Sequence, residues 1–177
     1  TVTEESSVPF ETKYVDVQTI ARGKTKVAKA GANGVSTATY KVTYVNGVES
    51  ERVLESQVIT KQPTTQVVNR GVGGTITIGG KTYRYSHYID CKTTVYTGGG
   101  TTASGLPATE AVIAVDPRVI PLGTKVYVAD SYCYVGIRTA ADTGGAIKGN
   151  FIDIYFDEDN PSLWGYGVRS ARVYILD

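Results

Sequence analysis

The near absence of helical periodicity is the feature that most constrains this fold. Apolar residues do not recur at the spacing of an amphipathic helix, and short alternating runs are broken by Gly, Asn and Pro instead. In residues 37–44, Ala38, Tyr40, Val42 and Tyr44 alternate with polar residues, as on the two faces of a strand. This pattern predicts β structure.

Turn signals divide the chain into many short strands. Asn46-Gly47 tolerates the positive φ angles of a tight hairpin turn, so a returning strand should begin at Val48. Asn160-Pro161 can open a short helix. Short strands separated by glycine-rich turns are typical of barrels and sandwiches. Further strands are expected at residues 75–78, 111–115, 124–128, 134–141, 151–156 and 172–176.

Size and charge limit the functions that the chain can have. Its 177 residues suffice for one domain or two small ones, and a composition change after Gly71 suggests units 1–72 and 73–177. A net charge of +1 gives no electrostatic reason to expect nucleic acid as a partner. No membrane-spanning stretch and no signal peptide are present in these residues, and any export signal is expected to have been removed.

The residues that build metal sites and nucleophilic triads are scarce. His87 is the only histidine, and the spacing of Cys91 and Cys133 matches no paired metal motif. No nucleophile elbow accompanies His87, so a Ser-His-Asp triad is not expected. We predict no metal and no cofactor. Trp164, the single tryptophan, is expected in the core, with sugar stacking as the alternative.

Three aspartates allow a structural and a chemical interpretation. Asp153 alternates with Ile152 and Ile154, so it faces away from them, as either a solvated edge residue or an acid in a partly apolar cleft. Asp142 begins an Asp-Thr-Gly turn and could equally present a carboxylate at a strand end. Asp116 precedes Pro117, where an aspartate commonly ties down a turn.

The first half resembles the five-glycine (G5) domain of bacterial surface proteins. Gly23, Gly31, Gly34, Gly47 and Gly71 are the counterparts of the named glycines. The resemblance implies an extended β module suspected of binding amino sugars, and a simple spacer is the alternative. The matching segments are residues 8–12, 23–25, 43–49 and 58–63.

The second half, from about Thr82, resembles the three-aspartate (3D) domain. The three family aspartates fall on Asp116, Asp142 and Asp153, whereas Phe151 stands where relatives often have Arg. The family is similar to the core of membrane-bound lytic transglycosylase A, which implies a double-psi β-barrel. We therefore expect an all-β protein with an extended module before that barrel. The segments that carry the resemblance are residues 96–105, 113–124, 141–150 and 152–156.

The resemblance implies a monomeric, secreted or wall-associated peptidoglycan lytic transglycosylase, which cleaves between N-acetylmuramic acid and N-acetylglucosamine. Asp153 would be the catalytic acid, Asp142 its partner and Asp116 a support for the loop. Glycan strands of peptidoglycan would be the partner. The expected supporting or substrate-binding residues are Asp116, Tyr96, Thr101, Thr102, Ser104, Gly144, Gly145, Lys148 and Tyr155.

Two functions other than lytic transglycosylase remain possible. Asp142-Thr143-Gly144 is also the triplet of aspartic proteases, which would require a symmetric dimer. A wall-binding protein without catalysis is the third possibility.

In an oxidising compartment, Cys91 and Cys133 are expected to form a disulfide, since both could border the same sheet.

Overall fold

The protein is all-β, as the sequence predicts. The computed structural model describes residues 1–177, and its only helix is the 3-10 turn Pro161–Leu163, capped by Asn160. No helix has the length and apolar character needed to cross a membrane. The contacts divide the chain into two compact units, Thr1–Asp16 with Thr25–Arg70 and Val17–Lys24 with Gly71–Asp177.

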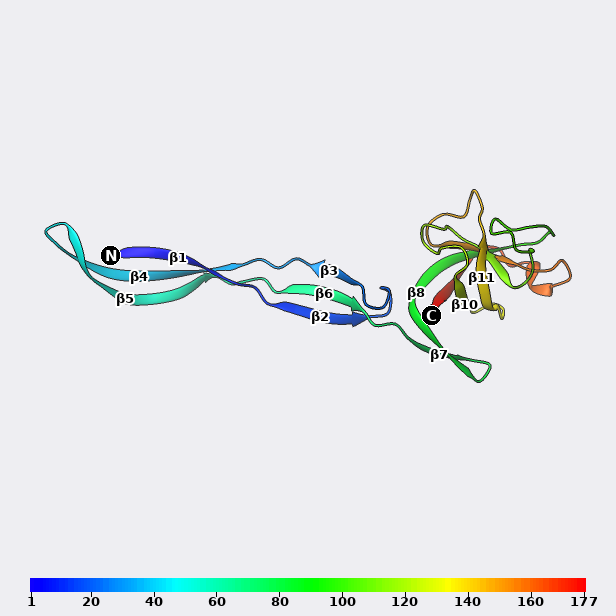
Figure 1. The fold of residues 1–177 in the computed structure, drawn as a ribbon, viewed down its shortest axis with the longest axis horizontal. Helices are drawn as coiled ribbons and strands as arrows, with labels where there is room; N and C mark the ends of the chain where they lie inside the picture. Colours follow the sequence, from blue (N-terminus) through cyan, green and yellow to red (C-terminus); the bar gives the residue numbers. More distant parts are fainter. The chain divides into compact units, whose positions relative to one another are not determined.

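The first unit consists of two small sheets. In one, β4 (Gly34–Val45) lies between β1 (Val2–Val8) and β5 (Val48–Lys61), with antiparallel pairing on both sides. In the other, β6 (Gln66–Gly71) lies between β2 (Thr12–Val17) and β3 (Thr25–Lys29). Figure 1 shows the two sheets following one another along this unit. Because neither is covered by a second layer, little of this unit can be buried.

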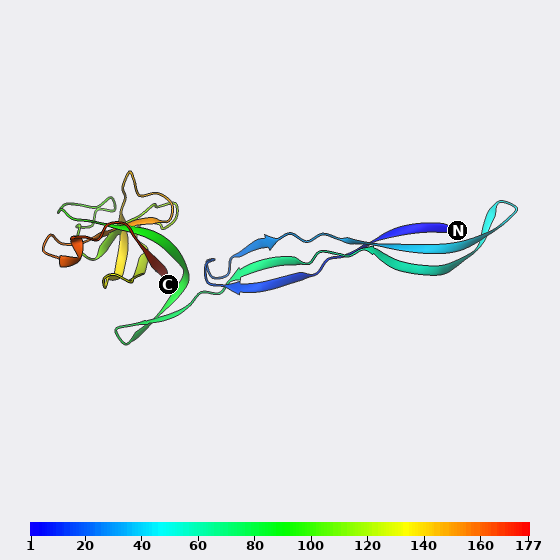
Figure 2. The same cartoon turned by 180° about the vertical axis from the view of Figure 1, so that it is seen from behind.

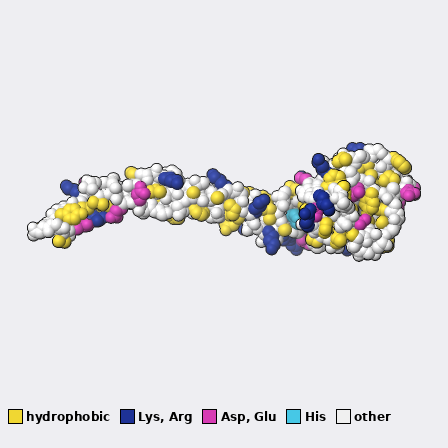
Figure 3. Space-filling view, turned by 90° about the horizontal axis from the view of Figure 1, so that it is seen from above, with side chains coloured by type: hydrophobic (Ala, Val, Ile, Leu, Met, Phe, Trp, Pro, Cys, Tyr) yellow, Lys and Arg dark blue, Asp and Glu magenta, His cyan; other side chains and the backbone are white.

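The predicted hairpin of the first unit is present, but its expected buried face is largely missing. Asn46 and Gly47 have φ angles of 51° and 80°, which confirms the hairpin turn before Val48. Ala38 is buried, whereas Tyr44 on the same face is 58% exposed. Figure 3 shows hydrophobic side chains at the surface all along this unit, among charged ones.

The second unit contains a barrel that is closed by backbone hydrogen bonds. β12 (Phe151–Tyr155) pairs with β9 (Val112–Ala114) on one side and with β8 (Lys81–Tyr96) on the other. The pairing order β12-β9-β11-β10-β13-β8 therefore returns to β12, and β7 (Gly74–Ile78) extends β8 outside the ring. Figure 2 shows the long β8 curving around this unit. The remaining strands are β10 (Lys125–Asp130), β11 (Gly136–Asp142) and β13 (Arg169–Leu176).

Alternate residues of each barrel strand pack into the interior. Ile152, Ile154 and Phe156 are at most 2% exposed and belong to the main core cluster, which confirms the predicted core face. Asp153 therefore lies on the opposite face of the wall. Tyr155 is on that face too and packs with Val112 and Ala141 in a second, smaller cluster.

Residues 17–24 pack with the barrel unit. The Arg22 guanidinium donates to the Tyr85 carbonyl at 2.9 Å and pairs with Asp177 at 3.3 Å. The amide of Gly71 donates to the carbonyl of Lys24 at 2.9 Å. A barrel domain that begins at residue 73, as proposed from the sequence, would omit these contacts.

Two predictions are wrong, and one long strand was not predicted. Cys91 and Cys133 are free thiols, with Cys91 buried in the barrel core, so the expected disulfide is not formed. Trp164 is 74% exposed rather than in the core, because it follows the short helix on an outer loop. β8 spans Lys81–Tyr96, although the sequence shows no alternation of apolar and polar residues between turns that would have predicted it.

Candidate functional site

Four residues form a row across the outer face of the barrel wall. Ala114 on β9 is the register partner of Asp142 on β11 and also of Asp153 on β12. Asp153 in turn pairs with Thr94 on β8. Directly paired residues project from the same face of a sheet, so the row Asp142, Ala114, Asp153, Thr94 shares one surface. The sequence predicts that the strands of Asp142 and Asp153 adjoin, but β9 lies between them.

A bulge in β11 brings Asp142 into this row. Ala140 pairs with Ile113, whereas Asp142 already pairs with Ala114, so the register shifts at Ala141. Ala140 and Ile113 both belong to the interior cluster. If β11 alternated regularly after Ala140, without this bulge, Asp142 would face inward as well. β-bulges commonly redirect a side chain at a functional site, and this one places a carboxylate on the outer face.

The two carboxylates border a small cavity of about 120 Å³. Asp142, Thr143, Gly144 and Ile147 border it from the end of β11 and the following loop, and Asp153, Ala114 and Tyr96 complete its lining. Asp142 and Asp153 are separated by one intervening strand, which is about 10 Å between their backbones. The methyl group of Ala114 leaves the space between them open.

Asp153 lies in a partly apolar environment. Burial raises the pKa of its carboxyl group, while a hydrogen bond from Thr94 at 2.8 Å acts in the opposite direction. The elevated pKa agrees with the sequence-based expectation, but a neighbouring carboxylate does not contribute to it. The apolar cavity lining comes from Ala114, Ile147 and the ring of Tyr96, not from Phe151 and Tyr155 as predicted.

Asp142 is held by the backbone of two loops. Its Oδ1 accepts hydrogen bonds from the amides of Ala103 and Thr143, both at 2.9 Å. Its Oδ2 accepts a longer bond of 3.4 Å from the hydroxyl of Tyr96. Burial, followed by the charge of Asp142, raises the pKa of Tyr96, so this hydroxyl stays a proton donor at neutral pH.

Asp116 lies outside the cavity and is only 2% exposed. Arg118 donates to both of its carboxylate oxygens, at 3.0 and 2.7 Å, and the amide of Gly149 donates to Oδ2 at 2.8 Å. The hydrogen bond from Arg118, followed by that from Gly149, lowers the pKa of Asp116 well below its usual range. Asp116 thus ties the turn after β9 to the loop before β12.

The other predicted residues are distributed unevenly around the cavity. Gly144 and Tyr96 line it, and Tyr155 lies behind it with its ring centroid 5.2 Å from that of Tyr96. Thr102 is buried and donates to the carbonyl of Leu106, while the amide of Ser104 donates to that of Ala141. These bonds fix the loop that supports Asp142. Thr101, Gly145 and Lys148 are exposed and line no part of the cavity.

Sequence reasoning missed Thr94, Ala114 and Ile147. Thr94 and Ala114 are ordinary strand residues, and only their pairing with Asp153 brings them to the site. Ile147 lies within the glycine-rich loop after Asp142, where its side chain is buried against Gly144. No local signal in the sequence separates them from other strand and loop residues.

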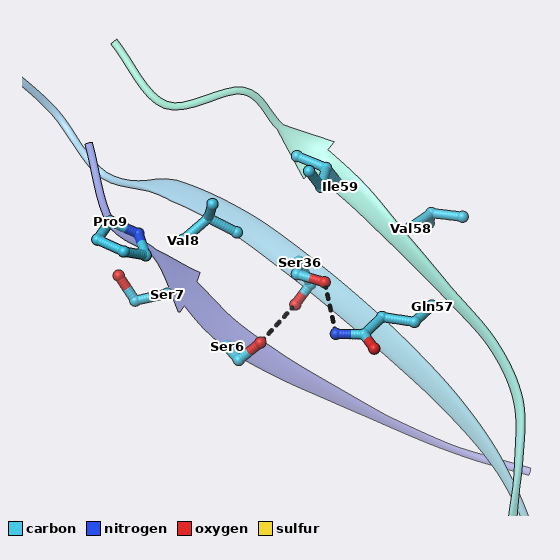
Figure 4. A pocket seen from close by; sticks show the side chains of 8 residues that line it. All are labelled: Ser6, Ser7, Val8, Pro9, Ser36, Gln57, Val58 and Ile59. Carbon is cyan, nitrogen blue, oxygen red and sulfur yellow. Dashed lines mark hydrogen bonds between the residues drawn. The ribbon is translucent and has the colours of Figure 1, made fainter. Parts of the chain in front are cut away.

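A larger groove of about 420 Å³ lies in the first unit but carries no acid or base. Gln57 donates to the hydroxyl of Ser36 at 3.1 Å, and the hydroxyl of Ser6 donates to the backbone carbonyl oxygen of Ser36 (Figure 4). Val8, Pro9 and Ile59 supply apolar surface beside these groups. The side chains of this groove offer hydrogen-bonding groups but cannot transfer a proton at neutral pH. Nowhere in the chain do three His, Cys, Asp or Glu side chains gather as a metal site needs.

Comparison with protein families matches a segment in each half of the chain. Residues 1–72 match the G5 domain and residues 111–177 match the 3D domain. The chain carries a G5 domain followed by a 3D domain. The row of Asp142, Ala114 and Asp153 lies within the segment that matches the 3D domain, whereas Thr94 and Tyr96 precede it.

The relatives share only part of this chain. The cell wall-binding protein YocH of Bacillus subtilis is 51% identical over 79 residues, which is 42% of this chain and 26% of that protein. The chain thus spans about a quarter of the length of this relative. Among solved structures, MltA from E. coli with bound chitohexaose is 26% identical, with a TM-score of 0.40 over 45% of this chain and 28% of its own. The IgA1 protease G5 domain is 22% identical, with a TM-score of 0.31 over 40% of this chain and 83% of its own.

Proposed function

We propose that the 3D domain is a peptidoglycan lytic transglycosylase in which Asp153 is the general acid and then the base. One observation carries the proposal: a half-buried carboxyl group with an elevated pKa borders a cavity opposite a second, hydrogen-bonded carboxylate. Perturbed carboxyl groups in a cavity are candidates for acid–base catalysis. The match to the 3D domain and the wall-binding name of YocH point to peptidoglycan as the substrate.

The proposed reaction needs only one group that gives and then takes a proton. Protonated Asp153 donates its proton to the glycosidic oxygen, and the bond from that oxygen to the anomeric carbon of N-acetylmuramic acid breaks. The 6-hydroxyl of the same sugar then bonds to the anomeric carbon and returns its proton to the Asp153 carboxylate. The products are a free 4-hydroxyl on N-acetylglucosamine and a 1,6-anhydro end, without addition of water.

Asp142 is assigned to charge stabilisation and sugar binding. The amides of Ala103 and Thr143 fix its carboxylate in place, where it can face the positive charge that develops at the anomeric carbon. The cavity of about 120 Å³ is smaller than the roughly 300–1,000 Å³ of a ligand-enclosing pocket. It therefore fits the reacting bond, and the rest of the glycan strand must lie outside it.

Digestion of purified sacculi tests the proposed reaction. The full chain should release muropeptides with 1,6-anhydro ends, which mass spectrometry distinguishes by the missing water, and the reaction should proceed in the presence of a chelator. Products with ordinary reducing muramic ends would instead identify a muramidase. Complete loss of activity with the chelator would contradict the metal-free mechanism.

A second candidate is a wall-binding protein without catalysis, located at the cell surface. The name of YocH as a cell wall-binding protein favours it, and the groove in the first unit supplies hydroxyl and amide groups that could contact a sugar. Sedimentation with purified walls together with a complete lack of released muropeptides would support this function over the first.

A further inference from the structure

Asp153 has one polar and one apolar neighbour in the barrel wall. On β9 its register partner is Ala114, which offers no hydrogen bond. On β8 its partner is Thr94, whose hydroxyl donates to Oδ1 of Asp153 at 2.8 Å. The structure gives this carboxyl group no other hydrogen bond. Its two oxygens are therefore not equivalent.

A neutral carboxyl group has one carbonyl oxygen, which accepts hydrogen bonds, and one hydroxyl oxygen, which donates. A donor directed at Oδ1 favours the form in which Oδ1 is the carbonyl and Oδ2 carries the proton. We propose that Thr94 is a positioning residue that keeps the transferable proton of Asp153 on Oδ2, the oxygen to which Thr94 is not hydrogen-bonded. The inference rests on the proposed acid catalysis by Asp153.

Thr94 is well placed to hold this geometry. The parallel pairing between β8 and β12 sets its backbone in register with Asp153 over the whole of β12. Thr is branched at Cβ, so its χ1 angle is restricted and its Oγ1 atom can take few positions. The same bond favours the ionised form of Asp153, which limits how far burial raises the pKa.

The other titratable groups of the cavity do not replace this contact. Tyr96 on β8 and Asp142 on β11 are the titratable side chains that line it with Asp153, and Tyr96 is hydrogen-bonded to Asp142 instead. β9 contributes only Ala114, and the loop after β11 contributes Thr143, Gly144 and Ile147. The orientation of the proton on Asp153 thus depends on Thr94.

Two substitutions in the full chain test this role. Thr94→Val keeps the branched shape and removes the hydroxyl, whereas Thr94→Ser keeps the hydroxyl. Thr75→Val, at an exposed position on β7, is the control for the same chemical change elsewhere in the unit. Carbon-13 titration of the Asp153 carboxyl group gives its pKa independently of turnover, and circular dichroism checks the fold.

Thr94→Val should raise the pKa of Asp153, since a donor to the ionised form is lost. Turnover of sacculi should fall about tenfold in kcat with little change in KM, the rate equivalent of one hydrogen bond. The alkaline limb of the pH profile should move to higher pH. Thr94→Ser should restore both the pKa and most of the rate, and Thr75→Val should match the wild type.

Equal pKa values and equal kcat in Thr94→Val and the wild type would overturn the proposal. Equal impairment of Thr94→Val and Thr94→Ser would do the same, because shape rather than the hydroxyl would then matter. If the wild type releases no anhydro products, the proposed function fails. In that case a higher pKa of Asp153 in Thr94→Val than in the wild type still supports Thr94 as the residue whose hydrogen bond positions the Asp153 carboxyl group.

Discussion

At the scale of single residues, the chemistry centres on Asp153. Its substitution by Asn removes the transferable proton and keeps the shape. We expect at least about a hundredfold loss of turnover, the usual size of a general-acid contribution, with wall binding retained. Asp159→Asn, at an exposed position beyond the same strand, should leave turnover unchanged. Near-normal turnover in a folded Asp153→Asn protein would assign the acid to Asp142.

The same substitution should stabilise the fold at neutral pH. The pKa of Asp153 is raised in the folded state, so its contribution to stability is present at low pH and is lost as the pH rises through the folded pKa. Asn carries no charge to be buried, so the melting temperature of Asp153→Asn should exceed that of the wild type at pH 7 and approach it near pH 4. Thermal melts at both pH values measure this difference, and a lower melting temperature at pH 7 would contradict it.

Ala114 is expected to set the space between the two carboxylates. It is 4% exposed and borders the cavity, so the two extra methyl groups of Ala114→Val would enter the space that the substrate needs. We expect a loss of at least about tenfold in kcat/KM, alongside the destabilisation that extra methyl groups cause in packed sites. Ala129→Val makes the same change on β10, at a residue that does not line the cavity. If both variants keep wild-type turnover, Ala114 does not border the reacting bond.

At the scale of elements, Asp116 joins two turns of the barrel. Asp116→Asn removes the charge that Arg118 and the Gly149 amide stabilise, and we expect the melting temperature to fall by several degrees at pH 7. The pKa of Asp116 is lowered in the fold, so this stability is present above the unfolded value of about 4 and is lost as the pH falls. The difference in melting temperature from the wild type should therefore shrink below about pH 4. A variant that loses turnover without any loss of stability would give Asp116 a role in substrate binding.

At the scale of the whole molecule, residues 17–24 decide how the barrel unit can be isolated. Because Gly71 is hydrogen-bonded to Lys24, a short Gly-Ser linker can join them and replace residues 25–70. We expect this shortened chain, starting at Val17, to melt above a fragment of residues 73–177, which lacks Arg22 and its bonds to Tyr85 and Asp177. Equal melting temperatures would mean that residues 17–24 add nothing to the barrel.

Removing the first unit should separate wall affinity from chemistry. The groove around Ser36 carries no acid or base, so turnover of short soluble glycans should change little in the shortened chain. Sedimentation with purified walls should decrease more, because the groove around Ser36 is lost. If a folded shortened chain cleaves no short glycans, the first unit is part of the active site.

The choice of Asp142 and Asp153 as catalytic candidates came from the resemblance to the 3D domain, whereas local pattern in the sequence determined most barrel strands other than β8, the Asn46-Gly47 turn, and the core face of Ile152 and Ile154. These features depend on residues a few positions apart, and alternation and turn chemistry report them directly.

Only the tertiary structure decided what surrounds the candidates. Strand pairing is non-local, so no local pattern places Ala114 between the two aspartates or Thr94 beside Asp153. A one-residue bulge at Ala141 reverses the face of Asp142, which strict alternation would have buried. The exposure of Trp164 and the missing second layer over β4 likewise depend on which segments pack together, because burial is a property of neighbours in space.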